Sequence, residues 1–299
     1  MKFLVSGLLP YDSGKTEFVI GLIDGFLRIG YNPGYFKPLA GHNGWYQYET
    51  LLHTIENKLL IGHDAYVVAK KLNQLDKLSI INPLDILSMP IDPLLFKGRI
   101  RLYVDNMSSL AKTAVLMRLS RNIREQSNTI KPYHVYFFFK DTYMKLSIET
   151  RSILNDVIEN IRTGKNTLFV EAEAAFLEKL LSNPSVYSAL DENMNYLKEF
   201  NPLIIESFND AAAPTYGSLM VDIVIIVAPG KALLYSGERY RKAVEVYSYK
   251  GDPWNIKTSN ILDLLGSPMK SYDIPLKIQS DKYLDVFDNI VGFISSENY

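Results

Sequence analysis

The amino-acid sequence predicts an α/β fold, a three-layer arrangement in which helices flank a mostly parallel central sheet. Three observations predict it. Residues 2–6 form a short apolar run, residues from about 15 to 29 have helical periodicity, and a second apolar run ends near Lys37. A strand, a helix and a strand within about forty residues form a βαβ unit, which implies a parallel sheet with a right-handed crossover.

The helix expected over about 15–29 follows from its apolar pattern. Its apolar side chains recur at helical spacing, while its acidic and basic residues face elsewhere. Gly30 comes directly after the last turn, where glycine commonly ends a helix. The apolar positions are Phe18, Val19, Leu22, Ile23, Phe26 and Leu27.

The middle of the chain departs from this alternation. Residues 46–76 are expected to be helical. Residues 79–96 (SIINPLDILSMPIDPLLF) contain three prolines and predict an extended, irregular surface segment. Residues 99–106 (RIRLYVDN) are predicted to form a strand, and residues 113–140 two strands around a polar connection, as in an antiparallel hairpin.

The second half returns to alternation. Its predicted elements are a helix over 148–164, a strand running into a helix over 166–176, buried strands within 201–214 and 221–235, and helices over 238–249 and 258–267. The stretch from about 100 to 165 fits the alternation worst. We therefore expect residues 1–299 to form one domain with an insertion, of α+β character, at about 100–165.

Composition excludes several classes of function. The chain has no cysteine, and its four histidines are His42, His53, His63 and His134, so disulfides, thiolate catalysis and a multi-histidine metal centre are not expected. The formal net charge of −1 gives no global attraction to nucleic acid or membrane. Neither a signal peptide nor an apolar run of about 20 residues is present, which predicts a cytoplasmic protein without membrane association.

The segment GLLPYDSGKT, residues 7–16, lies between the first strand and the first helix. A phosphate-binding loop, G-x-x-x-x-G-K-[ST], needs small residues that expose backbone N–H groups, a lysine for the phosphates and a hydroxyl for Mg²⁺. This chain has Leu9 where that pattern has its first glycine. The segment predicts a nucleotide site, and the alternative is a structural turn with a solvated lysine. The loop residues expected to contact the nucleotide are Asp12, Ser13, Gly14, Lys15 and Thr16.

A magnesium ion between the phosphates also needs a carboxylate at the carboxyl end of a strand. Asp105, Glu171 and Glu206 each follow an apolar run, and Asp222 precedes its strand. Glu206 is our choice, because small residues and then another very apolar strand follow it. The other two carboxylates remain alternatives.

Lys37 ends the second predicted strand, and a glycine-flanked segment with His42 and Asn43 follows at once. Ligands of parallel α/β sheets bind at the carboxyl ends of the strands. These three residues are therefore candidates for binding an acceptor substrate. The alternative is that His42 is a surface residue and the nearby aromatic residues pack the next helix.

Three segments together resemble the dethiobiotin synthetase-like group of P-loop ATPases, part of the SIMIBI class that includes MinD-type ATPases. They are SGLLPYDSGKT, GYNPGYFKPLAG and NPLIIESFNDAAAP followed by VDIVIIVAP. The resemblance implies a P-loop NTPase fold. It also implies that Lys15 and Thr16 serve the phosphates and Mg²⁺, that Glu206 serves the metal, and that Lys37 faces the acceptor. The family's Thr-Asp-Thr run is missing, and Ser207-Phe208 replaces Gly-Ala.

The resulting hypothesis is an enzyme that uses ATP and Mg²⁺ to transfer a phosphoryl group to, or ligate, a small acceptor, with Lys15 and Lys37 as catalytic residues. One alternative is a nucleotide-dependent switch that regulates a partner and could act as a homodimer. A weaker alternative is a polynucleotide 5′-kinase, which the near-neutral charge disfavours. No N-K-x-D guanine signature occurs, so ATP is favoured over GTP.

Overall fold

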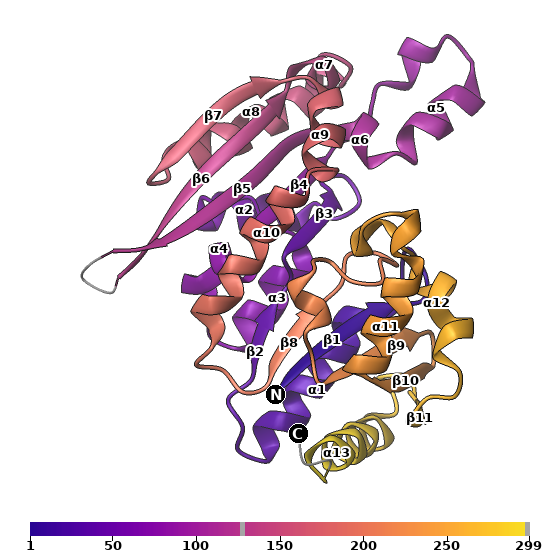
Figure 1. Ribbon diagram of the computed structural model, residues 1–299. Coiled ribbons are helices and arrows are strands. Elements are labelled where there is room, and N and C mark those ends of the chain that lie inside the picture. The colour runs from indigo at the N-terminus through magenta and orange to yellow at the C-terminus, as the bar shows by residue number, and fades with distance from the viewer. Residues whose placement is uncertain (126–128, 297–299) are drawn as a thin grey trace. The chain divides into compact units, whose positions relative to one another are not determined.

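The computed structural model describes residues 1–125 and 129–296, and the chain forms two compact units (Figure 1). Unit 1 comprises Met1–Pro38 and Tyr187–Tyr299, and unit 2 comprises Leu39–Val186. Each unit has its own mixed sheet flanked by helices. The α/β class is therefore as predicted. The stretch of about 100–165, expected as an insertion, lies within unit 2.

The sheet of unit 1 has the order β11-β10-β9-β1-β8-β2. Strand β1 pairs in parallel with both β8 and β9, and β2 pairs in parallel with β8, whereas β10 and β11 continue the sheet in antiparallel fashion. The strands are β1 (Lys2–Gly7), β2 (Gly34–Phe36), β8 (Leu203–Glu206), β9 (Ile223–Ala228), β10 (Lys231–Ser236) and β11 (Lys270–Asp273).

Strand β1 is central because both of its faces are apolar. Phe3, Leu4 and Val5 are fully buried, so the strand has a core on each side. Since β1 and β8 run in parallel, with Val5 opposite Glu206, their carboxyl ends lie at the same edge of the sheet. The segments that follow β1 and β8 are therefore neighbours.

The helices of unit 1 include one that the sequence patterns did not single out, α13 (Ser280–Ser296), which packs against α1 (Lys15–Arg28). The approach is close, because a Cβ atom on Gly21 would lie 2.4 Å from the ring of Phe287, and one on Gly25 2.8 Å from Val291. The other helices are α10 (Pro184–Glu192), which crosses the unit boundary, α11 (Gly237–Tyr247) and α12 (Thr258–Leu265).

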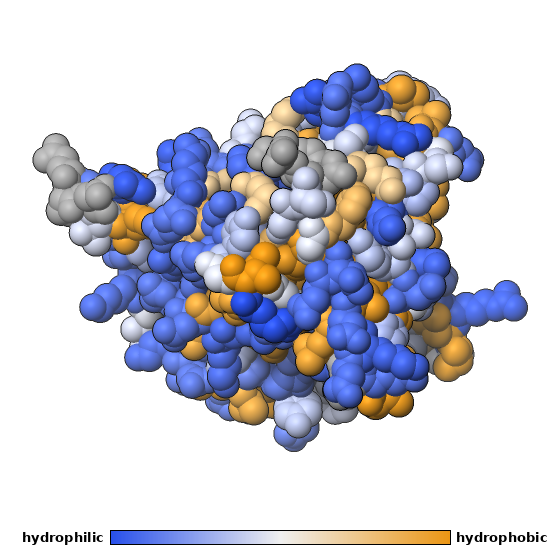
Figure 2. All heavy atoms as spheres, turned by 90° about the horizontal axis from the view of Figure 1, so that it is seen from below, coloured by the Kyte–Doolittle hydropathy of each residue, from blue (hydrophilic) through white to orange (hydrophobic). Residues whose placement is uncertain are grey.

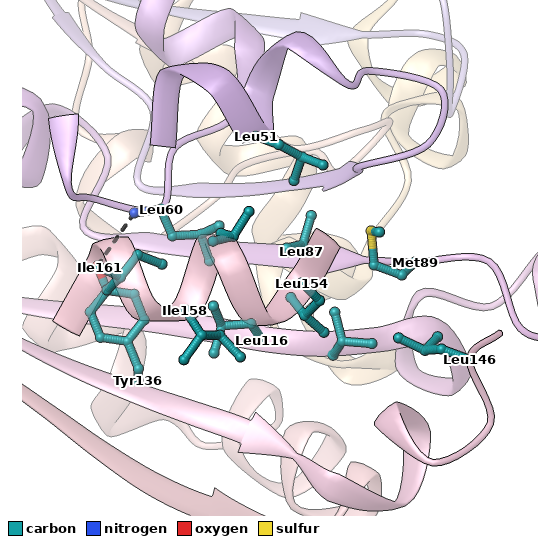
Figure 3. Close-up of a cluster of buried hydrophobic side chains, with 12 residues drawn as sticks. Leu51, Leu60, Leu87, Met89, Leu116, Tyr136, Leu146, Leu154, Ile158 and Ile161 are labelled. Atoms are coloured by element: carbon teal, nitrogen blue, oxygen red, sulfur yellow. Dashed lines mark hydrogen bonds between the residues drawn. The ribbon is translucent and has the colours of Figure 1, made fainter. Parts of the chain in front are cut away.

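The sheet of unit 2 has the order β3-β4-β5-β6-β7. Its core is a cluster of buried apolar side chains from β4, β5, α2 and α8, with Leu60 and Tyr136 at one end (Figure 3). The strands are β3 (Leu39–Asn43), β4 (Leu84–Ser88), β5 (Ala114–Arg124), β6 (Ile130–Phe139) and β7 (Thr167–Ala172).

The helices of unit 2 confirm the prediction of helix within 46–76 and over 148–164. They are α2 (Glu49–Asn57), α3 (His63–Lys71), α4 (Leu78–Ile81), α5 (Ile100–Met107), α6 (Leu110–Thr113), α7 (Lys140–Tyr143), α8 (Ile148–Arg162) and α9 (Ala174–Leu181). Strands β5 and β6 are antiparallel, as expected, although residues 126–128 of the polar connection between them lie outside the described residues.

Two predictions for unit 2 are wrong. Residues 79–96 contain the fully buried strand β4 and not only an irregular surface segment, because the first two prolines lie outside the strand and leave its ladder intact. Residues 99–106, predicted as a strand, lie almost entirely in helix α5 (Ile100–Met107), and this helix has no buried residue. Its apolar side chains do not enter a core, so they were no sign of a strand.

The surface is mixed. On the face seen in Figure 2, hydrophilic side chains cover most of the area, with small groups of hydrophobic ones between them. In the part of the chain that the structure describes, no helix has the length and apolar character needed to cross a membrane.

The contact between α1 and α13 predicts that alanine substitutions at two glycines change the stability of unit 1 in opposite directions. We expect Gly21→Ala to lower the free energy of unfolding of unit 1 by about 1–3 kcal/mol, because Phe287 is itself packed against Phe18 and cannot easily move. Gly292→Ala, on the exposed face of α13 with no atom near its Cβ position, should instead raise it by up to about 1 kcal/mol.

Urea unfolding measures both effects. Unit 1 can be followed through Trp254 in a Trp45→Phe background, since the chain has two tryptophans and Trp45 belongs to unit 2. Equal stability changes for the two alanine variants would contradict the packing described here.

Candidate functional site

The segment after β1 forms a loop that leads directly into α1. Asp12 and Gly14 have left-handed backbone conformations, with φ of 52° and 81°. Gly14 is the N-cap of α1, and its carbonyl accepts a hydrogen bond from the backbone N–H of Phe18 (2.9 Å). Glycine at this position avoids the strain that a side chain would meet there. The loop therefore ends at a helix N-terminus, where backbone N–H groups favour anions.

Lys15 folds back over the end of β1. Its Nζ atom donates a hydrogen bond to Ser13 Oγ (3.0 Å), and the residue is buried. A Cβ atom on Gly7 would lie 2.6 Å from Ser13 Oγ and 2.7 Å from Lys15 Nζ. Gly7, which lies too early for the usual motif, thus provides the space that the lysine occupies.

Glu206 ends strand β8 beside this loop and is fully buried. Thr16 Oγ1 donates a hydrogen bond to Glu206 Oε1 (3.1 Å), so the proximity expected of these two residues is found. The other two carboxylates lie in unit 2: Asp105 is on helix α5, and Glu171 on β7 pairs with Lys140 at 3.1 Å. Their roles as metal ligands stay alternatives.

Two residues of the second strand region also hold Glu206. Lys37 follows β2 directly, and its Nζ atom lies 2.7 Å from Glu206 Oε1 in a buried ion pair. The hydroxyl of Tyr35 donates to Glu206 Oε2 (2.7 Å). The ammonium of Lys37 was expected to face an acceptor substrate. It lies near Thr16, because both residues contact Glu206 Oε1. The positive charge of Lys37 is paired with the negative charge of Glu206.

His42 and Asn43, the other predicted substrate residues, belong to β3 of unit 2. His42 is buried, which the surface alternative did not anticipate, and its Nδ1 atom lies 2.9 Å from Asp85 Oδ1. Asp85 Oδ2 accepts a hydrogen bond from the backbone N–H of Gly62 (2.7 Å). Asn43 Oδ1 accepts from the backbone N–H of Trp45 (2.9 Å), which caps the turn that follows.

The aromatic residues after β3 do not pack as the alternative interpretation proposed. Trp45, Tyr46 and Tyr48 have exposed fractions of 60%, 76% and 66%. The structure thus brings Lys15, Thr16, Glu206 and Lys37 together in unit 1, while the substrate role of the β3 residues stays a prediction.

Unit 2 contains a buried polar cluster that the sequence patterns did not single out. Arg118 on β5 is fully buried, donates to the carbonyls of Leu60 (2.8 Å) and Asn82 (2.6 Å), and lies opposite Asp85 in the β4–β5 ladder. Burial lowers the pKa of Arg118, and Asp85 opposes that change. The sequence did contain a signal for this cluster: Arg118 lies on the same face of its strand as the apolar residue Leu116.

Comparisons with known proteins give no relative: no family model, curated protein or solved structure matches the chain. Among the described residues, no group of three or more His, Cys, Asp or Glu side chains could hold a metal ion. The Thr16–Glu206 pair supplies one hydroxyl and one carboxylate, so an ion bound there would need further oxygen ligands from a nucleotide or water.

The buried ion pair predicts a large effect on stability. We expect Glu206→Gln to lower the free energy of unfolding of unit 1 by about 3–5 kcal/mol, because it leaves the Lys37 ammonium buried without its counter-charge. The double variant Lys37→Met/Glu206→Gln should recover part of this loss, since it buries no unpaired charge.

Glu238→Gln is the matched control, because Glu238 forms an exposed ion pair with Lys242 (2.6 Å) and its removal should cause no measurable change. Chemical unfolding gives all three values. A Glu206→Gln variant as stable as the original chain would show that the pair is not buried as described.

Proposed function

We propose that unit 1 is a P-loop-type domain that binds ATP with Mg²⁺ and transfers a phosphoryl group to a small acceptor. One observation carries the proposal: Thr16 Oγ1 lies 3.1 Å from Glu206 Oε1, at the shared carboxyl edge of two neighbouring parallel strands. The hydroxyl after a glycine–lysine pair and a strand-end carboxylate are the two protein ligands that such a magnesium site uses.

The loop supports the phosphate part of the proposal. Gly14, in its left-handed conformation, is the N-cap of a 14-residue helix, so the helix dipole and the first backbone N–H groups face the loop. Lys15 is the first residue of that helix, and its ammonium lies above Gly7 beside Ser13. A lysine in this place supplies the positive charge that stabilises phosphate oxygens.

Thr16 and Glu206 fit the proposed Mg²⁺ site on one condition. Glu206 Oε1 accepts hydrogen bonds from both Thr16 and Lys37 in this structure. A cation beside that oxygen would repel the Lys37 ammonium. Mg²⁺ usually keeps several waters, so Glu206 would hold it through a water while Thr16 contacts it directly. When bound, the ion would neutralise charge on the phosphates.

Lys37 is the residue we assign to the acceptor. Its ammonium lies within the same network as Thr16, so it places a positive charge next to the phosphate loop. A positive charge at that place stabilises an anionic acceptor and the charge that develops during phosphoryl transfer. We therefore propose a small acidic acceptor.

A nucleotide-dependent switch is the second candidate, because the same network could transmit the state of the loop to β2 through Glu206, Lys37 and Tyr35. In that case Lys37 would serve structure and not turnover. The two candidates therefore differ in what Lys37 does.

The nucleotide proposal predicts a selective loss of binding. Lys15→Ala should weaken Mg-ATP binding at least about 100-fold, because the ammonium is the charged phosphate contact of the loop. Isothermal titration measures the dissociation constant, and circular dichroism verifies folding. Lys242→Ala, an exposed lysine of unit 1, should bind Mg-ATP like the original chain. Unchanged affinity of a folded Lys15→Ala variant would refute the phosphate-loop interpretation.

The acceptor role predicts a different pattern for Lys37→Met. Turnover of Mg-ATP, measured as phosphate release, should fall at least about 100-fold, because the charge acts on the transferring group. The dissociation constant for Mg-ATP should not rise, since the variant removes a competitor for Glu206. Turnover equal to that of the original chain, in a variant that still binds Mg-ATP, would favour the switch.

A further inference from the structure

Unit 2 contains a pocket of about 620 Å³ at one end of its sheet, and all of its lining residues belong to unit 2. It lies between the start of β6, the turn after α8 and the segment after α2. The turn is held in place, because Asn166 Nδ2 donates to the carbonyl of Pro132 (3.0 Å). A Cβ atom on Gly164 would lie 3.1 Å from the carbonyl of Lys58, so glycine allows the two segments to meet. The walls of the pocket are thus fixed by the fold.

A chain of buried hydrogen bonds defines the proton position on His134, which lines this pocket. Arg118 Nη1 donates to Ser120 Oγ, and an arginine cannot accept a hydrogen bond. A hydroxyl can accept two hydrogen bonds, but among the described residues Ser120 Oγ contacts only Arg118 and His134 Nδ1, the latter at 2.8 Å. The single proton of Ser120 therefore has His134 Nδ1 as its acceptor, because the opposite arrangement would leave that buried proton without one. With Nδ1 as the acceptor, the neutral ring carries its proton on Nε2, and that N–H has no hydrogen-bond partner among the described residues.

Burial keeps this tautomer neutral. His134 is 9% exposed, and burial, with the nearby Arg118 charge as a second cause, lowers its pKa to about 3. The ring is therefore uncharged through the physiological range. It offers a hydrogen-bond donor to a ligand but does not accept a proton from it.

The rest of the lining mixes apolar residues with polar and charged ones, and its charged residues have a positive excess. Three lysines (Lys58, Lys131 and Lys165) and two acids (Asp76 and Glu125) line the pocket, a difference of one positive charge. Lys131 is paired with Glu125 at 3.5 Å. Lys58 and Lys165 therefore carry most of the attraction for an anion, while leucines and a proline form the apolar wall.

We propose that this pocket binds a small amphiphilic carboxylate. Its acid group accepts a hydrogen bond from His134 Nε2–H and lies near Lys58 and Lys165, and its apolar body lies along Leu59 and Leu78. The site would make unit 2 a ligand-binding module, whatever unit 1 does with its nucleotide.

The test uses the full chain labelled with ¹⁵N-histidine, octanoate as the probe and octanamide as its neutral counterpart. Long-range ¹H–¹⁵N correlation should show His134 protonated at Nε2 before any ligand is added. Octanoate should then shift the His134 resonances in a saturable way and octanamide far less. His53 and His63, which belong to unit 2 but do not line the pocket, are internal controls and should not move.

Matched variants separate this site from general binding. Lys58→Gln/Lys165→Gln should weaken octanoate binding about tenfold, since the variant removes both positive charges of the lining that are unpaired among the described residues and each exposed charge contributes modestly. Lys70→Gln/Lys112→Gln, two lysines of unit 2 outside the pocket, should leave binding unchanged. Ser120→Ala should abolish the preference for the Nε2–H tautomer, because it removes the proton donor to Nδ1.

Three outcomes would overturn the proposal. They are a His134 ring protonated at Nδ1 in the original chain, equal shifts with octanoate and octanamide, and an affinity that does not change in Lys58→Gln/Lys165→Gln.

Discussion

The carboxylate of Glu206 is the interaction on which unit 1 depends. It is fully buried and accepts hydrogen bonds from Thr16, Tyr35 and Lys37, which come from the first helix and from the segment of the second strand. A buried charge is costly unless it is paired and hydrogen-bonded, so these contacts must form together. One side chain thereby fixes the loop after β1 against two neighbouring strands.

The same constraint has a chemical consequence. A carboxylate that holds an ammonium cannot approach a metal ion without loosening that pair, so in unit 1 stability and the proposed chemistry share one oxygen atom, Glu206 Oε1. Any ligand that draws the carboxylate away from Lys37 must supply comparable interactions. The proposed nucleotide site is therefore coupled to the end of β2 through a single charged group.

Unit 2 also contains a fully buried charged group, in this case a positive one. Arg118 is fully buried, and the carbonyls of Leu60 and Asn82 accept hydrogen bonds from its guanidinium. Asp85 lies opposite it in the ladder and also contacts His42. The arginine orients Ser120 in turn, so a group whose first role is structural also determines which nitrogen of a pocket-lining histidine carries the proton.

The sequence alone determined what depends on local patterns. The apolar runs identified β1, β8 and β9, and the helical spacing identified α1, because these periods follow from backbone geometry. The spacing of Ser13-Gly14-Lys15-Thr16 between a strand and a helix was likewise visible, and small residues after Glu206 placed this carboxylate near Thr16 correctly.

Only the tertiary structure decided that Lys37 is paired with Glu206 and that residues 39–186 form their own unit, because both depend on contacts between residues far apart in the chain. The exposed helix α5 and the buried strand β4 were also beyond local patterns, since burial is set by the neighbours that a segment acquires on folding.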